Sequence, residues 1–491
     1  MRNRIAAVAL FTCILPAGIP PADLAAQESG PVAIVGATVI DGTGAAPMSD
    51  ATILISGGRI TAIGPRSQVD VPLGAQTVDG TGKYVVPGFI DANVHMSLYG
   101  AGESFVRYEQ QNVDLTLESA QLHLKHGITT VRDSYGSLLA LVEVRDRIAR
   151  GEVDGPRILA AGNIVGWGGP YSISFALTRQ SGLSLFQEQI NDFITQGSGE
   201  DLMEMTPAEL RVAINRYLDK GPDFIKFGGT SHFSDPVMIG FSPAAQQVMV
   251  EEAHKRGLVA ETHSTSSEGL RLSLEAGVDL VQHPEILPGE MSDEMVRMFV
   301  DRGVICSMLS NTITGEPWER HLKRLEDRSE SEDTATVVQR KKTSVELREE
   351  RDAAGHGMQV RRTNAEKLIR AGCITTIGTD NYLGSAPEFR REPKALNQEM
   401  GIGSIIAIEG LVELGMTPMQ ALVAATRNGA LATKGIADYG TLEVGKLADL
   451  LVLDADPLAD ISNIRKLSVV MKRGEVIDRD ALPIKPVWHG R

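Results

Sequence analysis

The sequence predicts a parallel (β/α)8 barrel of the TIM-like α/β class, joined to a small β-sandwich domain that both chain ends build. Three observations predict this fold. Eight short β-type runs recur through the middle of the chain, helical segments lie between them, and strand-like stretches with glycine-rich turns occupy both ends. Alternating strands and helices indicate βαβ units, and eight parallel strands close a barrel.

The eight predicted barrel strands lie within residues 87–430, which we assign to the barrel domain. Segments such as 243–256 and 267–276 have helical character and separate them. The predicted strands are Asp91–His95, Thr129–Arg132, Ile158–Ala161, Phe224–Phe227, Val259–His263, Leu280–His283, Val304–Met308 and Thr375–Asp380.

Two of the intervals between these strands are too long for one helix. We therefore predict insertions near 163–222 and 312–365. The second includes residues 316–362, in which 11 basic and 11 acidic residues cancel. A dense mixture of acidic and basic residues is typical of an inserted helical segment that faces solvent. Since barrel active sites lie at the carboxyl ends of the strands, either insertion would also be placed to act as a lid.

Residues 27–86 and 431–491 form the predicted β domain. Short apolar runs such as Ile53–Ile55 and Ile60–Ile63 flank the turn 56–58. The same pattern of short apolar runs recurs at residues 448–454 and 467–471. Neither piece is long enough to build a core of its own, so we expect the two to fold together.

Residues 1–26 have the layout of a signal peptide. Arg2 and Arg4 precede the apolar stretch 5–14, and small residues end the segment at Ala26. This pattern predicts export and cleavage, which would leave the protein periplasmic or secreted. A disordered leader is the alternative.

Composition excludes several classes of protein. The chain has 491 residues, 42% hydrophobic and 23% charged, with a formal net charge of −15. This acidity argues against a nucleic-acid partner, and we expect no membrane span in the mature chain. We expect a small-molecule substrate; whether the chain forms a homo-oligomer is left open. Cys13 lies in the leader, and we predict that Cys306 and Cys373 are buried free thiols.

Polar side chains end five of the eight predicted strands. They are His95, Lys226, His263, His283 and Asp380. The carboxyl ends of barrel strands meet at one mouth, so these groups should converge. Asn93 should point the same way as His95, because residues two apart on a strand share a face. Imidazole and carboxylate are ligands of Zn²⁺ and other borderline divalent metals.

Six motifs together resemble the metal-dependent amidohydrolase superfamily, over essentially the whole mature chain. The resemblance is greatest to the imidazolonepropionase-like branch. The motifs are Val86-Pro-Gly-Phe-Ile-Asp-Ala-Asn-Val-His95, Gly127-Ile-Thr-Thr-Val-Arg-Asp133, Glu261-Thr-His263, Gln282-His283, Gly378-Thr-Asp380 and Gly445-Lys-Leu-Ala-Asp-Leu450.

The resemblance implies one or two divalent metal ions at the barrel mouth. Asn93, His95 and Asp380 would serve one metal, and His263 and His283 the second. Lys226, carbamylated by CO₂, would bridge them; a salt-bridged lysine is the alternative. Zinc is the first expectation, and cobalt, manganese or iron would also suit these ligands.

Asn93 departs from the usual family pattern, which has His-x-His. An asparagine carbonyl is a weaker ligand than imidazole, so the first metal should be held less tightly or be absent. The Asn-x-His variant is similar to the subgroup that contains phenylurea hydrolases and molinate hydrolase.

We therefore expect hydrolysis of a C–N bond in an amide, urea or carbamate. Metal-activated water would attack the carbonyl, with Asp380 as the catalytic acid and base. An N-cap role for Asp380 is the structural alternative. Two other functions stay open: an exported prolidase-like dipeptidase, and a non-catalytic binding protein with this fold.

Further substrate-binding candidates are less specific. His232 follows the fourth strand and is either near the substrate or an ordinary loop residue. Trp167, Tyr171 and Tyr382 are candidates for a substrate pocket. We expect His126 to be a cation at a helix end, and Asp133 to serve either function or loop capping.

Overall fold

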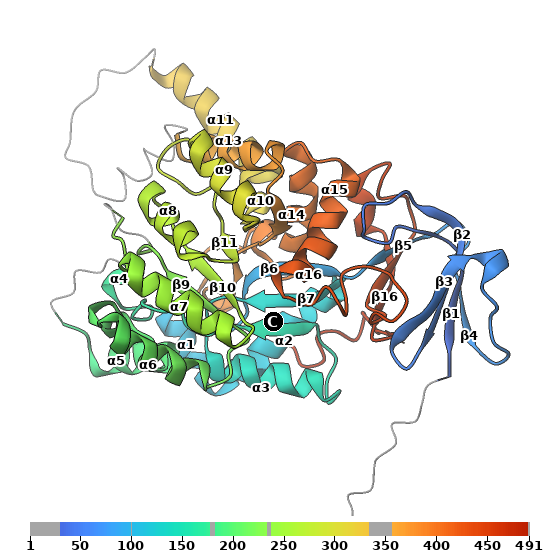
Figure 1. The fold of residues 1–491 in the computed structure, drawn as a ribbon, viewed down its shortest axis with the longest axis horizontal. Helices are drawn as coiled ribbons and strands as arrows, with labels where there is room; N and C mark the ends of the chain where they lie inside the picture. The colour runs from blue at the N-terminus through green and yellow to red at the C-terminus, as the bar shows by residue number, and fades with distance from the viewer. Residues whose placement is uncertain (1–29, 100, 177–181, 233–236, 333–355, 490–491) are drawn as a thin grey trace, which may run out of the picture.

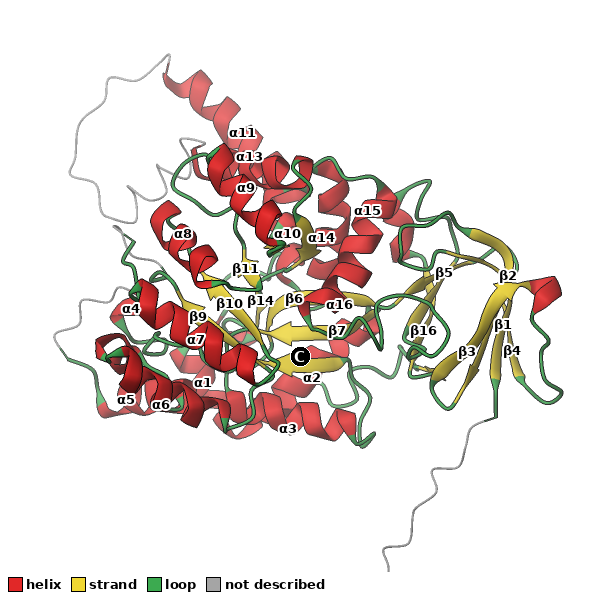
Figure 2. Ribbon diagram, in the orientation of Figure 1, coloured by secondary structure: helices red, strands yellow, loops and turns green. Residues whose placement is uncertain are grey.

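The computed structural model describes residues 30–99, 101–176, 182–232, 237–332 and 356–489. The predicted signal peptide, residues 1–26, lies outside the described residues, as does the centre of the second predicted insertion. Helices surround the barrel strands, and a separate sheet stands at one end of the molecule (Figures 1 and 2).

The barrel is closed by eight parallel strand positions. Strands β6, β7 and β8 pair in order, and β9 to β13 form the second arc. An isolated bridge joins Val165, in the segment that follows β8, to Phe227 of β9. At the other seam, β14 follows β13 directly and pairs with β6. The predicted (β/α)8 barrel is confirmed.

The observed strands agree with the eight predicted runs to within a few residues. The barrel strands are β6 (Phe89–His95), β7 (Ile128–Asp133), β8 (Arg157–Ala160), β9 (Phe224–Gly228), β10 (Val259–His263), β11 (Leu280–Gln282), β12 (Ile305–Met308), β13 (Ile374–Ile377) and β14 (Asn381–Tyr382).

Helices link the strands and cover the barrel. Several begin with a serine or threonine cap, as Thr206 and Ser242 do, each followed by proline. The helices are α1 (Gly102–Tyr108), α2 (Asn112–Lys125), α3 (Leu138–Ala149), α4 (Ile173–Ala176), α5 (Leu185–Thr195), α6 (Pro207–Leu218), α7 (Pro243–Lys255), α8 (Ser267–Ala276), α9 (Asp293–Arg302), α10 (Ser310–Ile313), α11 (Gly315–Glu332), α13 (His356–Arg370), α14 (Ile402–Glu413), α15 (Pro418–Val423) and α16 (Gly429–Ala432). Among the described residues, none of these helices is long and apolar enough to span a membrane.

The barrel interior is packed. Phe224, Leu280 and Ile305 belong to a buried apolar cluster on the strands. Glu261 follows Val259 of the same cluster by two residues on β10 and forms a fully buried ion pair with Arg132 at 2.7 Å. The Arg132 guanidinium lies over the Phe224 ring. A filled interior leaves the carboxyl ends of the strands as the place where polar groups can meet a ligand.

Strands from both chain ends form one eight-stranded sheet. Its order is β17-β16-β15-β5-β1-β2-β3, and β4 pairs with β1. The N-terminal strands are β1 (Val32–Val39), β2 (Met48–Ser56), β3 (Arg59–Pro65), β4 (Gln76–Asp79) and β5 (Tyr84–Pro87), and the C-terminal strands are β15 (Leu450–Leu453), β16 (Leu467–Lys472) and β17 (Glu475–Val476). The expected joint β unit is present, because β5 and β15 are hydrogen-bonded neighbours.

A glycine pair makes the tight turn of this sheet. Gly57 and Gly58, between β2 and β3, both have positive φ. Two-residue hairpin turns of this kind need left-handed backbone at both positions. A side chain at Gly58 would also meet the Arg473 carbonyl at 2.9 Å.

The regions of the two predicted insertions contain helices. The first holds α4, α5 and α6, with 177–181 outside the description, and the second holds α10, α11 and much of α13, with 333–355 outside it. Helix α5 begins with a capping box of Ser184 and Gln187.

The prediction of two free thiols is wrong. Cys306 and Cys373 form a disulfide, with their Cα atoms 6.5 Å apart. Cys306 lies on β12, and Cys373 immediately precedes β13, its hydrogen-bonded neighbour. The two cysteines are 67 residues apart in the sequence, so only the strand pairing reveals that they are adjacent.

Candidate active site

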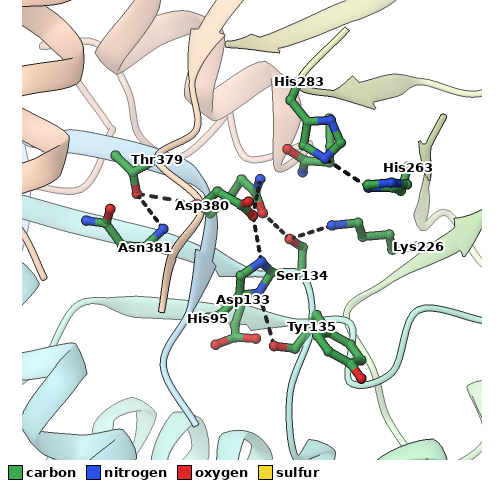
Figure 3. Close-up of polar contacts among 12 residues, drawn as sticks. His95, Asp133, Ser134, Tyr135, Lys226, His263, His283, Thr379, Asp380 and Asn381 are labelled. Carbon is green, nitrogen blue, oxygen red and sulfur yellow. Dashed lines mark hydrogen bonds and ion pairs between the residues drawn. The ribbon is translucent and has the colours of Figure 1, made fainter. Parts of the chain in front are cut away.

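The five predicted groups meet at the carboxyl ends of the barrel strands (Figure 3). His95 ends β6 and His263 ends β10, whereas His283 and Asp380 follow β11 and β13. Lys226 lies within β9. The three histidines and the lysine expose at most 5% of their surface, while the Asp380 side chain is 35% exposed.

Two close pairs form the centre of the site. Nε2 of His95 lies 2.7 Å from Oδ1 of Asp380, and Nδ1 of His263 lies 3.0 Å from Nε2 of His283. Figure 3 shows Lys226 beside His263, with its amine directed toward Ser134. No three His, Cys, Asp or Glu side chains within the described ranges form a metal site by themselves. A metal centre here would therefore need Lys226 or Asn93 as well.

The orientation of His95 is fixed by a backbone carbonyl. Its Nδ1 lies 3.1 Å from the oxygen of Tyr135, which can only accept a hydrogen bond. Nδ1 therefore carries the proton, and Nε2 is the nitrogen directed at Asp380. A carbonyl partner of this kind also orients metal-binding histidines. In this structure Nε2 donates to the Asp380 carboxylate, and it would give up that proton to bind a metal.

The other two histidines are in the protonation state that binds metals. Burial lowers the pKa of His263 well below its usual value and lowers that of His283 to about 3. Both rings are therefore neutral at physiological pH and present lone pairs. Neutral imidazoles, a carboxylate and a buried lysine are a donor set that fits a divalent transition metal.

Asp380 is held as a carboxylate. Burial raises its pKa, but the hydrogen bond from His95 and the nearby charge of Lys226 hold that pKa well below the ordinary range. An ionised carboxylate at neutral pH can accept a proton.

The backbone is strained at two of these residues. Asp380 has φ of 56° and His283 has φ of 39°, a region that residues with a side chain rarely adopt. Such strain clusters at functional sites, where the surrounding structure fixes a side chain in one direction.

Asp91 supports the Asp380 segment from inside the barrel. Its carboxylate accepts hydrogen bonds from Thr379 Oγ1 at 2.8 Å and Ser404 Oγ at 2.6 Å. Burial raises the pKa of Asp91 to about 6. Asp91 belongs to the first sequence motif, but no pattern in the sequence indicates this role.

Lys226 is buried among polar groups. Burial lowers the pKa of its amine, and Nζ donates to Ser134 Oγ at 3.2 Å. Ser134 in turn contacts the side chain of Asn93, which points inward from β6. Ser134 and Tyr135 were missed by the sequence analysis, although they directly follow Asp133 at a strand end.

Two of the four substrate-binding candidates, Trp167 and His232, lie beside His263, one of the predicted metal ligands. The Trp167 ring is 4.7 Å from the His263 ring, and the His232 ring is 5.3 Å from it. Burial lowers the pKa of His232 to about 3. Tyr382 is 44% exposed next to Asp380. Tyr171 is half-buried, and its backbone N–H donates to Asn191.

Aromatic rings absent from the predictions also surround His95. Its ring centroid lies 5.7 Å from that of Tyr99 and 6.1 Å from that of Tyr135. Phe175 stacks on His232 at 4.9 Å. The sequence offered no signal for Tyr99, in the segment after β6, or for Phe175 on α4.

Asp133 and His126 both make capping contacts. Asp133 Oδ2 accepts from the Met96 backbone N–H at 2.6 Å, which is the loop-capping alternative. His126 caps the end of α2, as expected. The prediction that His126 is a cation is wrong, because burial lowers its pKa to about 4.

A comparison with protein families matches residues 84–477 to the amidohydrolase family. The chain belongs to the amidohydrolase family. The structure of phenylurea hydrolase B has a TM-score of 0.81 and 31% identity, covering 94% of this chain and 100% of that one. Molinate hydrolase has a TM-score of 0.81 and 29% identity, with coverage of 94% and 98%.

A curated relative of the same kind is similar to this chain over most of its length. Imidazolonepropionase of Geobacillus sp. (strain WCH70) is 22% identical over 452 residues, covering 88% of this chain and 90% of the relative. Members of the amidohydrolase family are generally metal-dependent. This amidohydrolase is an enzyme, a hydrolase that acts on carbon–nitrogen bonds.

Proposed function

We propose that this amidohydrolase hydrolyses the C–N bond of a neutral amide, urea or carbamate at the site of His95, Lys226, His263, His283 and Asp380. The observation that carries the proposal is the meeting of the His95–Asp380 and His263–His283 pairs beside one buried lysine. Phenylurea hydrolase B and molinate hydrolase, which share the fold at 31% and 29% identity, support this class of substrate.

The same residues would hold a divalent metal, zinc by first expectation. Carbamylated Lys226 would join the two pairs, since CO₂ adds to a neutral amine and burial favours that form. A bound metal would lower the pKa of its water to about 7 and would polarise the substrate carbonyl.

Asp380 would move the proton of the reaction. Its carboxylate is ionised and partly exposed, so it can take a proton from the attacking water and give it to the leaving nitrogen. Water adds to the carbonyl carbon, the C–N bond breaks, and an acid and an amine result.

The surroundings favour an uncharged substrate with an apolar group. Tyr99, Tyr135 and Trp167 place rings beside the histidines. The charge of Arg361 is one of the causes that lower the pKa of His283. Arg361 lies 4.0 Å from Glu285 and donates a hydrogen bond to Thr312 at 2.7 Å. Its charge is therefore compensated, whereas a dipeptidase needs a cation or a Tyr/His group for the substrate carboxylate.

The test is amine release by zinc-loaded protein from aryl ureas, carbamates, N-acyl amino acids and dipeptides, followed by chromatography. We expect turnover of a neutral urea, carbamate or anilide. Hydrolysis of dipeptides alone would establish the dipeptidase alternative, and no hydrolysis with a full metal site would favour a binding protein.

We also propose that the protein is exported after removal of residues 1–26. The Cys306–Cys373 disulfide supports this proposal, because disulfides persist in oxidising compartments. N-terminal sequencing of the protein from a periplasmic fraction should begin near residue 27, and an intact cytoplasmic chain would contradict export.

A further inference from the structure

A chain of hydrogen bonds crosses the mouth of the barrel from Lys226 to Asp380. Lys226 Nζ donates to Ser134 Oγ at 3.2 Å. Ser134 Oγ donates to Asn93 Oδ1, and Asn93 Nδ2 donates to Asp380 Oδ1 at 3.2 Å. Figure 3 shows Ser134 at the centre of this chain.

The direction of every hydrogen bond in this chain follows from its ends. The Asp380 carboxylate can only accept, so it must face the amide nitrogen of Asn93 rather than its oxygen. The amide oxygen is then turned toward Ser134, whose single hydroxyl proton it accepts. The remaining lone pairs of the Ser134 hydroxyl face Lys226.

Burial makes this arrangement costly to disturb. Asn93 and Ser134 have no exposed surface, and Lys226 has 1%. Removing the Ser134 hydroxyl would leave the Asn93 oxygen and the Lys226 nitrogen each without this partner, and buried polar groups depend on such partners.

The backbone fixes where the Ser134 hydroxyl lies. The Ser134 N–H donates to the Val94 carbonyl of β6 at 3.1 Å. The next residue, Tyr135, accepts from His95 Nδ1. One turn after β7 therefore orients both His95 and Lys226, which belong to different parts of the site.

We propose that Ser134 is a positioning residue that holds Lys226 and, through the Asn93 amide, Asp380 in the arrangement that binds the metal. Asn93 then acts chiefly as a hydrogen-bond bridge between Ser134 and Asp380. This inference rests on the proposed function, because it assigns Ser134 a role at the same metal site.

The test uses Co²⁺ alone as the probe. Wild-type, S134A and control S119A proteins are titrated with Co²⁺ and followed by visible absorption and chelator competition. Ser119 is a matched control, because it is a buried serine of α2 whose hydroxyl has no partner in the described structure. We expect S134A to bind Co²⁺ 10–100-fold more weakly, the range typical of lost support to a metal ligand, with an altered spectrum. S119A should match wild type.

A double-mutant cycle tests the route through Asn93. If Ser134 acts through that amide, S134A should cost at least fivefold less Co²⁺ affinity in an N93A background than in wild type. Equal losses in both backgrounds would overturn the route from Ser134 to Asp380 through the Asn93 amide. S134C nearly keeps the volume but is a weak hydrogen-bonding group, so it should show the same direction of loss should S134A fail to fold.

The outcomes separate this inference from the proposed function. Wild-type protein that binds no Co²⁺ and hydrolyses nothing would overturn the proposed function itself. Wild-type protein that binds Co²⁺ and releases amine, with S134A indistinguishable from S119A in affinity, spectrum and kcat, would overturn only the role of Ser134.

Discussion

Oδ1 of Asp380 and Nε2 of His95 lie 2.7 Å apart, although 285 residues separate them in the sequence. The contact spans the seam at which β14 pairs with β6 and closes the barrel. Closure of the barrel therefore places a carboxylate from the last strand position on a histidine from the first.

We predict that D380N abolishes turnover while the protein stays folded. The amide cannot take up a proton, so kcat for amine release should fall about 10²–10⁴-fold, the range for loss of a general acid and base. Metal content by mass spectrometry should stay largely intact, because an amide oxygen can still bind. Near-normal turnover would remove Asp380 from the mechanism.

We predict that Lys226 carries a carbamate. Arginine stays protonated and cannot be carbamylated, so K226R should lose metal and activity. With ¹³C-bicarbonate, wild type should show a carbamate carbon signal by NMR that K226R lacks.

The control for this prediction is K472R. Lys472 is a second buried lysine, and burial lowers its pKa to about 8. It contacts the Asp449 carboxylate at 3.2 Å, and at pH 7 most of it is an ammonium ion. K472R should keep the carbamate signal. Metal and signal retained in K226R would contradict carbamylation of Lys226.

The sequence predicted the barrel and most of the site because both follow from local pattern. The buried strands are short apolar runs, and His95, His263 and Asp380 stand at strand ends, where barrel geometry brings them together. Tertiary neighbours were not predictable in this way. The Cys306–Cys373 disulfide depends on which strands pair, and Ser134 is a common residue type whose partners come from β6 and β9.

The charge states of buried groups could not be predicted from the sequence either. His126 stands at a helix end, where a cation is favourable, yet burial keeps it neutral. Desolvation of a buried cation outweighs the small gain from a helix dipole, and burial is known only from the folded structure.

We predict that His489 stabilises the fold below alkaline pH. Its ring lies 3.2 Å from Glu118 and 3.5 Å from Glu399, and hydrogen bonds to these carboxylates raise its pKa to about 9. A raised pKa contributes stability that is fully present below the unfolded value near 6.5 and lost as pH rises through about 9.

The measurement is urea unfolding of wild type and H489Q. At pH 7 the variant should be less stable by roughly 1 kcal/mol, a value reduced for the 38% exposure of this side chain. At pH 10.5 the difference should vanish. A difference independent of pH would refute the charge-based explanation.

We predict that the disulfide stabilises the fold by constraining the unfolded chain. It closes a loop of 67 residues, for which chain entropy suggests about 4 kcal/mol. Unfolding of the C306A/C373A variant should show a loss of this order in the free energy of unfolding. An unchanged midpoint in urea would show that the bond contributes nothing.

The decisive measurement for metal-dependent hydrolysis at this site is amine release from one neutral substrate before chelation, after chelation and after Zn²⁺ is returned. We predict at least a 100-fold loss on chelation and recovery with Zn²⁺, in step with one to two metal ions per chain. Undiminished amine release from metal-free protein would show that hydrolysis at this site needs no metal.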